Sequence, residues 1–345
     1  MTEIKTLTIA ELKTALTDMG EKPFRAGQIF KWLHQPVESF DEMTDLSKDL
    51  RAKLAQRFVL TVPVIERKQV SKVDGTVKYL WRMQGGDCVE SVLMRYKHGN
   101  TVCVSTQVGC RMGCVFCASG LFGLKRNLSA GEILDEVLFM QKDSGEPVHN
   151  IVLMGTGEPL DNYENVVKFL HLVSSEGGVN IGQRHISLST SGIADKIDML
   201  AKEKLQITLS ISLHAPDNDS RSAMMPVNRS FPIERLIAST NAYFDTTGRR
   251  VSYEYAMARG VSDRPWQAEQ LAKLLRGRPA HVNLIPLNEV AESALKPSTR
   301  ESVRKFQQIL EKHGIAATVR RKLGPDIDAA CGQLRRRQLE NEGTK

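Results

Sequence analysis

The stretch Gly109–Cys117, with the sequence GCRMGCVFC, is the strongest indication of the fold and of the site that the fold carries. It places Cys110, Cys114 and Cys117 in the spacing C-x3-C-x2-C. A cubane of four irons and four sulfides usually takes four cysteine ligands, so three thiolates leave one iron open. An open coordination position is the mark of a catalytic metal site. The stretch therefore predicts an iron–sulfur cluster that binds another molecule at its open iron.

Zinc is the first alternative for these cysteines. Zinc sites usually pair two C-x2-C units or add histidine. Cys114 and Cys117 form one such unit, but Cys110 has no matching second unit nearby. A third explanation is that the thiols are simply buried. The spacing favours an iron–sulfur cluster over both.

The composition is that of an ordinary globular protein. The chain has 345 residues, 41% of them hydrophobic and 25% charged, which suits one large domain or a large and a small one. It has no run of eighteen apolar residues, and its first eighteen residues lack a signal-peptide core. We therefore expect a cytoplasmic protein with no membrane partner, in which cysteines are ligands or catalytic thiols rather than disulfides. The net charge of +7 permits an RNA partner, although it is equally explained by a soluble basic protein.

The first 98 residues predict a small accessory domain of helices and a β-hairpin. Apolar spacing indicates helices at residues 7–16, 24–33 and 46–58. Residues 64–83 alternate as two strands around a turn at Asp74-Gly75, and a further strand spans residues 87–94. We place the domain boundary at residues 98–100, with a core domain at 99–334 and a charged tail at 335–345.

From residue 101 onward, strands and helices alternate, which predicts a parallel α/β sheet that is either barrel-like or doubly wound. The expected strands are 102–105, 150–154, 185–189, 207–213, 251–257 and 282–285, with an extra strand at 316–320. The expected helices are 129–142, 163–173, 193–202, 233–244, 265–275 and 299–313.

Polar residues follow several of these strands at their carboxyl ends. The three-cysteine stretch follows the first strand, and Gly155–Glu158, Ser189, His214 and Asn288 follow later ones. Parallel-sheet enzymes place their chemistry at this edge of the sheet. We therefore expect these residues to meet in one active site.

With C-x3-C-x2-C after the first strand, the chain resembles the radical S-adenosylmethionine (SAM) superfamily, which implies a partial (β/α)6 barrel. In that superfamily SAM chelates the open iron of a [4Fe-4S] cluster, and electron transfer cleaves SAM to a 5′-deoxyadenosyl radical. The segment Met154–Pro159, MGTGEP, is similar to the superfamily's GGEP-type segment. Glycine lets that backbone approach the methionine moiety, and Glu158 can accept from a cationic group.

A closer resemblance is to the RlmN family of RNA adenine-C2 methyltransferases, and it spans essentially the whole chain. The motifs that support it are TVCVSTQVGC at 101–110, LKRNL at 124–128, SLHAP at 212–216, NLIPLN at 283–288 and DIDAACGQL at 326–334. The related Cfr family modifies carbon 8 of the same base, and the MGTGEPL and AAC segments are more like RlmN than Cfr.

The resemblance implies a mechanism with two further cysteines. Carbon 2 of adenine is electron-poor and cannot attack the methyl group of SAM as a nucleophile. One SAM is implied to methylate Cys331, and a second SAM generates a radical that takes hydrogen from that methyl group. The resulting methylene adds to carbon 2, Glu90 removes the carbon-2 proton, and Cys103 releases the base by forming a disulfide with Cys331. Cys88 matches no role in the family and is expected to be structural.

The resemblance also assigns SAM contacts and partners. The implied SAM contacts are Gly157, Glu158, Ser189, Ser212, Leu213, His214 and Asn288. On the residues alone, His214 is more often a structural histidine than a ligand contact, and Leu213 is a core residue. The implied substrates are 23S rRNA and tRNA next to the anticodon, and the basic accessory domain at residues 1–98 would help to hold the RNA. Flavodoxin or ferredoxin is the expected electron donor, and we expect a monomer.

Three rivals stay open at this point. They are a Cfr-type carbon-8 methyltransferase, a non-catalytic metal-stabilised RNA-binding module, and a radical enzyme acting on a small molecule. The second has no reason to hold Cys103 and Cys331 together with the SAM contacts. The third is disfavoured by the segment Ala329–Gln333.

Overall fold

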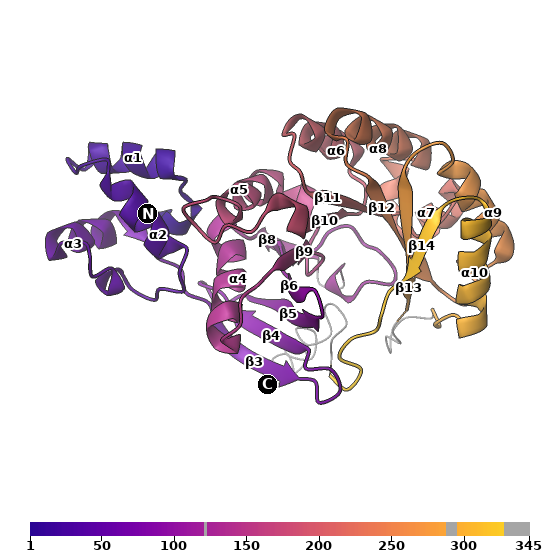
Figure 1. Cartoon of the computed structure of the whole chain (residues 1–345), viewed down its shortest axis with the longest axis horizontal. Helices are drawn as coiled ribbons and strands as arrows, with labels where there is room; N and C mark the ends of the chain where they lie inside the picture. The colour runs from indigo at the N-terminus through magenta and orange to yellow at the C-terminus, as the bar shows by residue number, and fades with distance from the viewer. Residues whose placement is uncertain (121–122, 288–294, 328–345) are drawn as a thin grey trace.

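The computed structural model describes residues 1–120, 123–287 and 295–327 (Figure 1). Within these residues, one ten-stranded sheet runs through the molecule in the order β14-β13-β12-β11-β10-β9-β6-β5-β4-β3. Its strands are β3 (Val64–Val70), β4 (Val77–Arg82), β5 (Cys88–Tyr96), β6 (Gly99–Cys103), β9 (Asn150–Leu153), β10 (Ile186–Thr190), β11 (Thr208–Ser212), β12 (Val251–Met257), β13 (Ala280–Pro286) and β14 (Ala316–Val319).

The half of the sheet from β6 to β14 is parallel, as the alternating pattern predicts. Helices follow these strands and cover one face of the sheet, so the architecture is a partial (β/α) barrel (Figure 1). The helices of this half are α4 (Ala130–Ser144), α5 (Tyr163–Val173), α6 (Ala194–Lys202), α7 (Asn218–Met224), α8 (Ile233–Thr247), α9 (Pro265–Leu274) and α10 (Arg300–Lys312). Every helix predicted in this half is confirmed, whereas α7 is an addition.

The hairpin strands β3, β4 and β5 extend the same sheet in antiparallel pairing. Gly75 has a φ of +72° in the turn between β3 and β4, so the turn predicted at Asp74-Gly75 is confirmed. β5 then pairs antiparallel with β6, with Val92 opposite Cys103. β5 and β6 are therefore hydrogen-bonded neighbours across residues 98–100, and the domain boundary placed there stays a prediction.

Three helices form a separate group at one end of the molecule (Figure 1). They are α1 (Ile9–Asp18), α2 (Arg25–Leu33) and α3 (Lys48–Arg57), joined by the short pair β1 (Thr2–Glu3) and β2 (Phe58–Val59). Thr8 and Glu11 form a capping box that fixes the start of α1. Lys5 lies fully buried in an ion pair with Asp135 of α4, which docks this group onto the sheet domain.

Short 3-10 helices complete the described part. They are η1 (Ile4–Thr6), η2 (Phe40–Glu42), η3 (Ala118–Gly120), η4 (Pro159–Asn162), η5 (Gln183–His185) and η6 (Pro226–Arg229). No helix among the described residues is both long and apolar enough to cross a membrane.

Side chains alternate between the two faces of the parallel strands. Ile186 and Leu188 of β10 are fully buried in the hydrophobic core, whereas Ser187 and Ser189 are partly exposed. Because Ser189 pairs with Ser210 of β11, the polar positions share one face across neighbouring strands. The face opposite the apolar core is therefore the polar one, and it leads to the active site at the carboxyl ends.

Candidate active site

A small ribbon holds the cysteine stretch. β7 (Gln107–Gly109) pairs antiparallel with β8 (Leu124–Asn127), one on each side of the stretch. Gly109 has a φ of +85°, and a Cβ there would overlap the carbonyl oxygen of Gly123, so this position requires glycine. The Cys110 amide donates to that same oxygen at 3.1 Å. The ribbon thus fixes both ends of the loop that presents the thiols.

Two thiols of this loop are buried close to other acidic groups. Burial, assisted by Glu158 and neighbouring cysteines, raises the pKa of Cys110 and of Cys114 to about 12. The part of the chain that the structure describes contains no group of three His, Cys, Asp or Glu side chains that could hold a metal ion. A cubane offers each ligand a separate iron, so its thiolates need not converge on one point. The donor set of three thiols beside one cavity therefore fits a [4Fe-4S] cluster.

A cavity of about 280 Å³ lies beside these thiols, at the carboxyl ends of β9 to β13. The predicted site residues that line it are Cys110, Cys114, Cys117, Gly157, Glu158, Ser189, Ser212 and His214. The structure therefore brings the thiols and most of the predicted SAM contacts around one cavity. Leu213 is different, because its side chain is fully buried in the core and does not line the cavity.

The glycine-rich loop after β9 packs tightly against the ribbon. Gly157 has a φ of +112°, and a Cβ there would lie 2.7 Å from the Cβ of Gln107. The buried Glu158 carboxylate accepts from the amides of Leu160 at 3.0 Å and Ser191 at 2.7 Å. Burial raises the pKa of Glu158, while the hydrogen bonds from Ser191 oppose that shift. Glu158 thus joins the ends of β9 and β10 at the wall of the cavity.

His214 lies buried just past the end of β11 in a left-handed conformation, with a φ of +59°. Burial, assisted by the nearby Arg221 cation, lowers the pKa of His214 to about 3. The ring is therefore neutral at physiological pH. Its Nδ1 accepts from the Ala256 amide at 3.0 Å, which leaves the proton on Nε2 as a donor. The edge of the ring meets Phe116 of the cysteine loop, with ring centroids 4.7 Å apart.

Two buried charged residues at this site were missed by the sequence interpretation. Glu254 of β12 lines the cavity and accepts from Asn283 of β13 at 2.8 Å. Burial raises its pKa, and the Arg320 cation opposes that shift. Arg221 is fully buried and donates to the Ser191 carbonyl at 2.6 Å. For Glu254 the sequence offers one signal, which is a charged residue inside an otherwise largely apolar strand. Charged side chains are rarely buried without a partner, so such a position suggests a functional or paired carboxylate.

Glu90 and Cys103 lie on neighbouring strands outside the cavity lining. Val92 is opposite Cys103 in the β5–β6 pairing, and Glu90 is two residues before Val92, so Glu90 and Cys103 share one face of the sheet. Glu90 forms an ion pair with Lys78 of β4 at 3.0 Å, and both side chains are buried.

A bridge of hydrogen bonds ties this face to the glycine-rich loop. The Ser105 hydroxyl donates to the Glu90 carbonyl at 2.7 Å and accepts from the Thr156 amide at 2.8 Å. These hydrogen bonds therefore fix the backbone at Glu90 relative to the loop that lines the cavity. The other two predicted residues, Asn288 and Cys331, lie outside the described residues.

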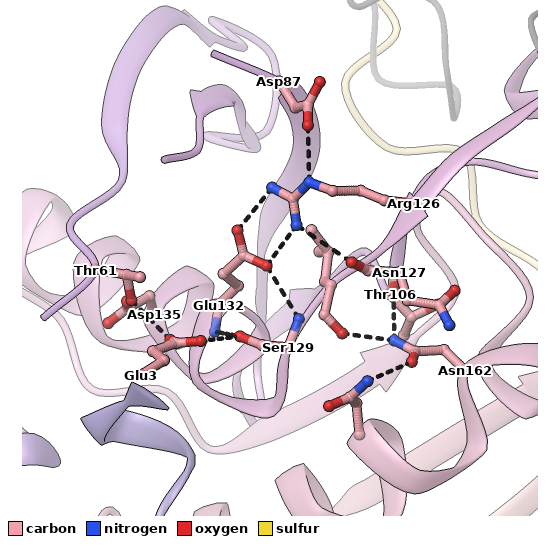
Figure 2. Close-up of polar contacts among 12 residues, drawn as sticks. Glu3, Thr61, Asp87, Thr106, Arg126, Asn127, Ser129, Glu132, Asp135 and Asn162 are labelled. Carbon is pink, nitrogen blue, oxygen red and sulfur yellow. Dashed lines mark hydrogen bonds and ion pairs between the residues drawn. The ribbon is translucent and has the colours of Figure 1, made fainter. Parts of the chain in front are cut away.

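A polar network links this region to the N-terminal helices (Figure 2). Arg126 of β8 donates to Asp87 at 2.7 Å and, through two nitrogens, to both carboxylate oxygens of Glu132 at 2.8 Å. Glu132 caps α4 together with Ser129, whose hydroxyl donates to Glu3. Asp87 lies three residues before Glu90. Arg126 thus fastens the end of the cysteine loop to the strand that positions Glu90.

We expect Arg126→Lys to lower the free energy of unfolding by about 1–3 kcal/mol, because lysine cannot bridge two carboxylates as the guanidinium fork does. Urea denaturation followed by circular dichroism measures this change. Lys125→Gln is the matched control, since Lys125 contacts the same Asp87 at 2.6 Å but its side chain is 69% exposed, against 32% for Arg126. An exposed pair contributes less than about 1 kcal/mol. An equal decrease in the free energy of unfolding in both variants would contradict the proposed role of the Arg126 guanidinium.

This chain is similar to known proteins over almost its whole length. Residues 2–60 match the family model "Ribosomal RNA large subunit methyltransferase N-terminal domain", and residues 104–274 match "Radical SAM superfamily". A protein of Alkaliphilus oremlandii named "Probable dual-specificity RNA methyltransferase RlmN" is 52% identical over 98% of this chain and 99% of its own length. A protein of the same name from Lachnoclostridium phytofermentans is 54% identical over 97% of this chain and 94% of its own.

Solved structures give the same picture. The crystal structure of a radical SAM methyltransferase from Sphaerobacter thermophilus superposes with a TM-score of 0.91 and 46% sequence identity. The match covers 96% of this chain and 99% of that one. The likeness therefore includes the N-terminal helices and the sheet domain together.

Proposed function

The chain belongs to the RlmN family of radical SAM methyltransferases, and from that premise we propose that it methylates carbon 2 of adenosine in RNA. By likeness to its dual-specificity relatives, the substrates are 23S rRNA and the tRNA adenosine next to the anticodon. The observation that supports this most strongly is the cavity where three thiols meet the glycine-rich loop and the ends of four further strands. RNA also suits the net charge of +7.

The residues around the cavity fit the two cofactors of this family. Cys110, Cys114 and Cys117 would hold the [4Fe-4S] cluster. The residues that would hold SAM are Gly157, Glu158, Ser189, Ser212, Leu213, His214 and Asn288. When bound, the cluster and SAM supply the one-electron chemistry that starts the reaction, and two SAM molecules are used per turnover. Glu158 would accept from the amino group of SAM, and the neutral His214 would donate from Nε2.

Three further residues would act on the RNA itself. Cys331 would hold the one-carbon unit as a thioether, because electron-poor carbon 2 cannot take a methyl group by displacement. Glu90 would accept the proton that leaves carbon 2 once the new bond has formed. Cys103 would then attack the sulfur of Cys331. That attack forms the Cys103–Cys331 disulfide and breaks the bond from Cys331 to the methylene carbon, which keeps the electron pair of that bond and takes up a proton to become the methyl group on carbon 2.

Some partners of the enzyme are further proposals. The electron donor is proposed to be a reduced flavodoxin or ferredoxin, and the enzyme is proposed to work as a cytoplasmic monomer. We also propose the division into residues 1–98, 99–334 and 335–345. The fully buried Lys5–Asp135 pair supports a fixed position of the N-terminal helices on the sheet domain.

Alanine at Cys110, Cys114 or Cys117 is expected to remove the cluster's iron and visible absorbance and to reduce methylation to background. The chain should still fold, because these residues lie in a loop held by the β7–β8 ribbon. Iron analysis and absorption spectra measure the loss, with far-UV circular dichroism as the folding check. Cys88→Ala is the matched control, a partly buried cysteine on β5 with no proposed role. Unchanged iron in the loop variants would count against this ligand set.

The position of the methyl group tests the proposed function. Mass spectrometry of 23S rRNA and tRNA from cells with and without this protein should find 2-methyladenosine only where the protein is present. Methylation at carbon 8 would identify the Cfr-type reaction instead. RNA that is identical in both cell types would reject both activities.

A further inference from the structure

A second hollow, of about 600 Å³, lies beside the active-site cavity and is lined by residues of α10 and of the end of β14. Figure 1 shows these two elements. We propose that it binds the sugar–phosphate backbone of the RNA substrate, one or a few nucleotides from the target adenosine. The inference rests on the proposed function, since it names the surface that holds the RNA for that reaction. We call this hollow the α10 groove.

One face of α10 forms a wall of the α10 groove. Arg300, Val303, Arg304 and Gln307 line it, and their spacing of three and four residues places them on the same side of the helix. The hydroxyl of Thr299 accepts from the Ser302 amide and fixes the start of the helix. Two guanidinium groups are therefore presented side by side on a rigid element rather than on a loop.

The charge in the α10 groove is uncompensated. Arg300, Arg304 and Lys322 are exposed, and none of them forms an ion pair with a described residue. No carboxylate lines the groove within the part of the chain that the structure describes. Exposed cations held close together without counter-charges repel one another, and a polyanion relieves that repulsion. Guanidinium forks also match the oxygens of a phosphate group.

The opposite side of α10 provides an internal comparison. The hollow there contains three cations, Arg259, Arg264 and Lys305, but also the carboxylates of Asp263 and Glu301. The protein itself therefore supplies carboxylates that offset most of the positive charge on that side. Among the described residues, only the hollow on the side next to the active site lacks carboxylates. That side of the helix is therefore the better suited to bind an anion.

The α10 groove also has apolar lining. Pro286, Pro297, Val303 and Val319 line it together with the cations, and Val319 is 42% exposed although it is aliphatic. A free inorganic anion gains nothing from such apolar surface. A nucleotide does, because its ribose and base present apolar surface while its phosphate reaches the cations. The combination therefore favours single-stranded RNA over a small anion.

The α10 groove leads to the active site. Pro286, at the end of β13, lines both the groove and the active-site cavity. Arg320 lines the cavity, and Lys322, two residues later, lines the groove. A strand seated in the groove can therefore extend directly toward the cavity.

The test compares two variants of the full-length enzyme that each remove two cations from α10. Arg300→Gln/Arg304→Gln alters the groove, and Lys305→Gln/Lys312→Gln alters the same helix elsewhere. Binding of an unmodified tRNA transcript is measured by fluorescence anisotropy over a range of salt concentrations. The groove variant should bind about tenfold more weakly near 0.15 M salt, with a slope of log K against log salt flatter by roughly 1 to 1.5. Reductive cleavage of SAM without RNA should be unchanged in both variants.

The outcomes separate the groove from the proposed function. Affinity and salt slope that match those of the control variant would overturn the α10 groove as an RNA site, even if the wild-type enzyme methylates the transcript. A wild-type enzyme that neither binds nor methylates tRNA or 23S rRNA fragments would overturn the proposed function and the groove with it.

Discussion

Cys103→Ala enzyme is expected to accumulate as a covalent complex with its RNA substrate, while release of methylated RNA falls to background. In the proposed sequence, RNA is joined to Cys331 until a second thiol attacks that sulfur. Alanine cannot make this attack, so the last step is blocked while the earlier ones proceed. The block should be nearly complete, because the proposed sequence assigns this attack to no other thiol.

Cys103 lies on a strand in the interior of the sheet. Its side chain is only 6% exposed, and β6 is hydrogen-bonded on both edges, with Val92 of β5 and Val152 of β9 beside Cys103. The sulfur thus occupies a fixed position on the sheet. Removing one sulfur atom from this position should cost about 1 kcal/mol of stability, so the variant should still fold.

Denaturing gel electrophoresis with labelled RNA measures the complex, and nuclease digestion followed by mass spectrometry locates the joined residue. Cys88→Ala is the control within the same sheet and should release methylated RNA normally. Cys331→Ala should give neither methylated RNA nor a covalent complex. If Cys103→Ala turns over like the wild-type enzyme, the assignment of the releasing thiol is wrong.

Glu90→Gln is expected to slow methylation by about 10²- to 10⁴-fold, the usual contribution of a positioned general base. Iron content and reductive cleavage of SAM should persist, because Glu90 does not line the cavity beside the thiols. The Lys78 side chain is 0% exposed and that of Glu90 4%, so this is a buried ion pair. Removing one member of such a pair typically costs about 3–5 kcal/mol.

The double variant Lys78→Met/Glu90→Gln separates chemistry from folding. It removes the buried ammonium together with the carboxylate, so its free energy of unfolding should exceed that of Glu90→Gln. Methylation should stay low in both variants, because neither has a base beside the RNA. Single-turnover rates and urea denaturation provide the two readouts. A double variant that regains more than a tenth of wild-type methylation would show that Glu90 acts through stability alone.

The sequence predicted most of the sheet domain because its strands and helices are long and strongly periodic. The β7–β8 ribbon was missed, since strands of three and four residues offer too few positions for a period to be recognised. α7 was missed because its sequence, NDSRSAM, has no apolar stripe. The β5–β6 pairing was also not foreseen, because a register between neighbouring strands leaves no local signature.

The active site was predicted through the rule that parallel strands end together. That rule correctly gathered the cysteine loop, Glu158, Ser189 and His214 around one cavity. It could not find Arg221 or the Lys78–Glu90 pair, because the partners of a buried charge come from distant parts of the chain. Those residues needed the three-dimensional structure.

The continuity of the sheet across β5 and β6 has a consequence for building chimeras within this family. A junction near residue 98 would exchange β3 to β5 and would require five residue pairs of the β5–β6 ladder to re-form between foreign partners. A junction near residue 60 leaves the whole ten-stranded sheet on one parent and keeps β1 with β2 on the other. What such a graft must match instead is the contact of the N-terminal segment with α4 and α5, which includes the ion pairs Lys5–Asp135, Glu38–Lys142 and Glu11–Lys168. Recombination near residue 60, rather than near residue 98, is therefore the practical route to exchanging the N-terminal helices between relatives.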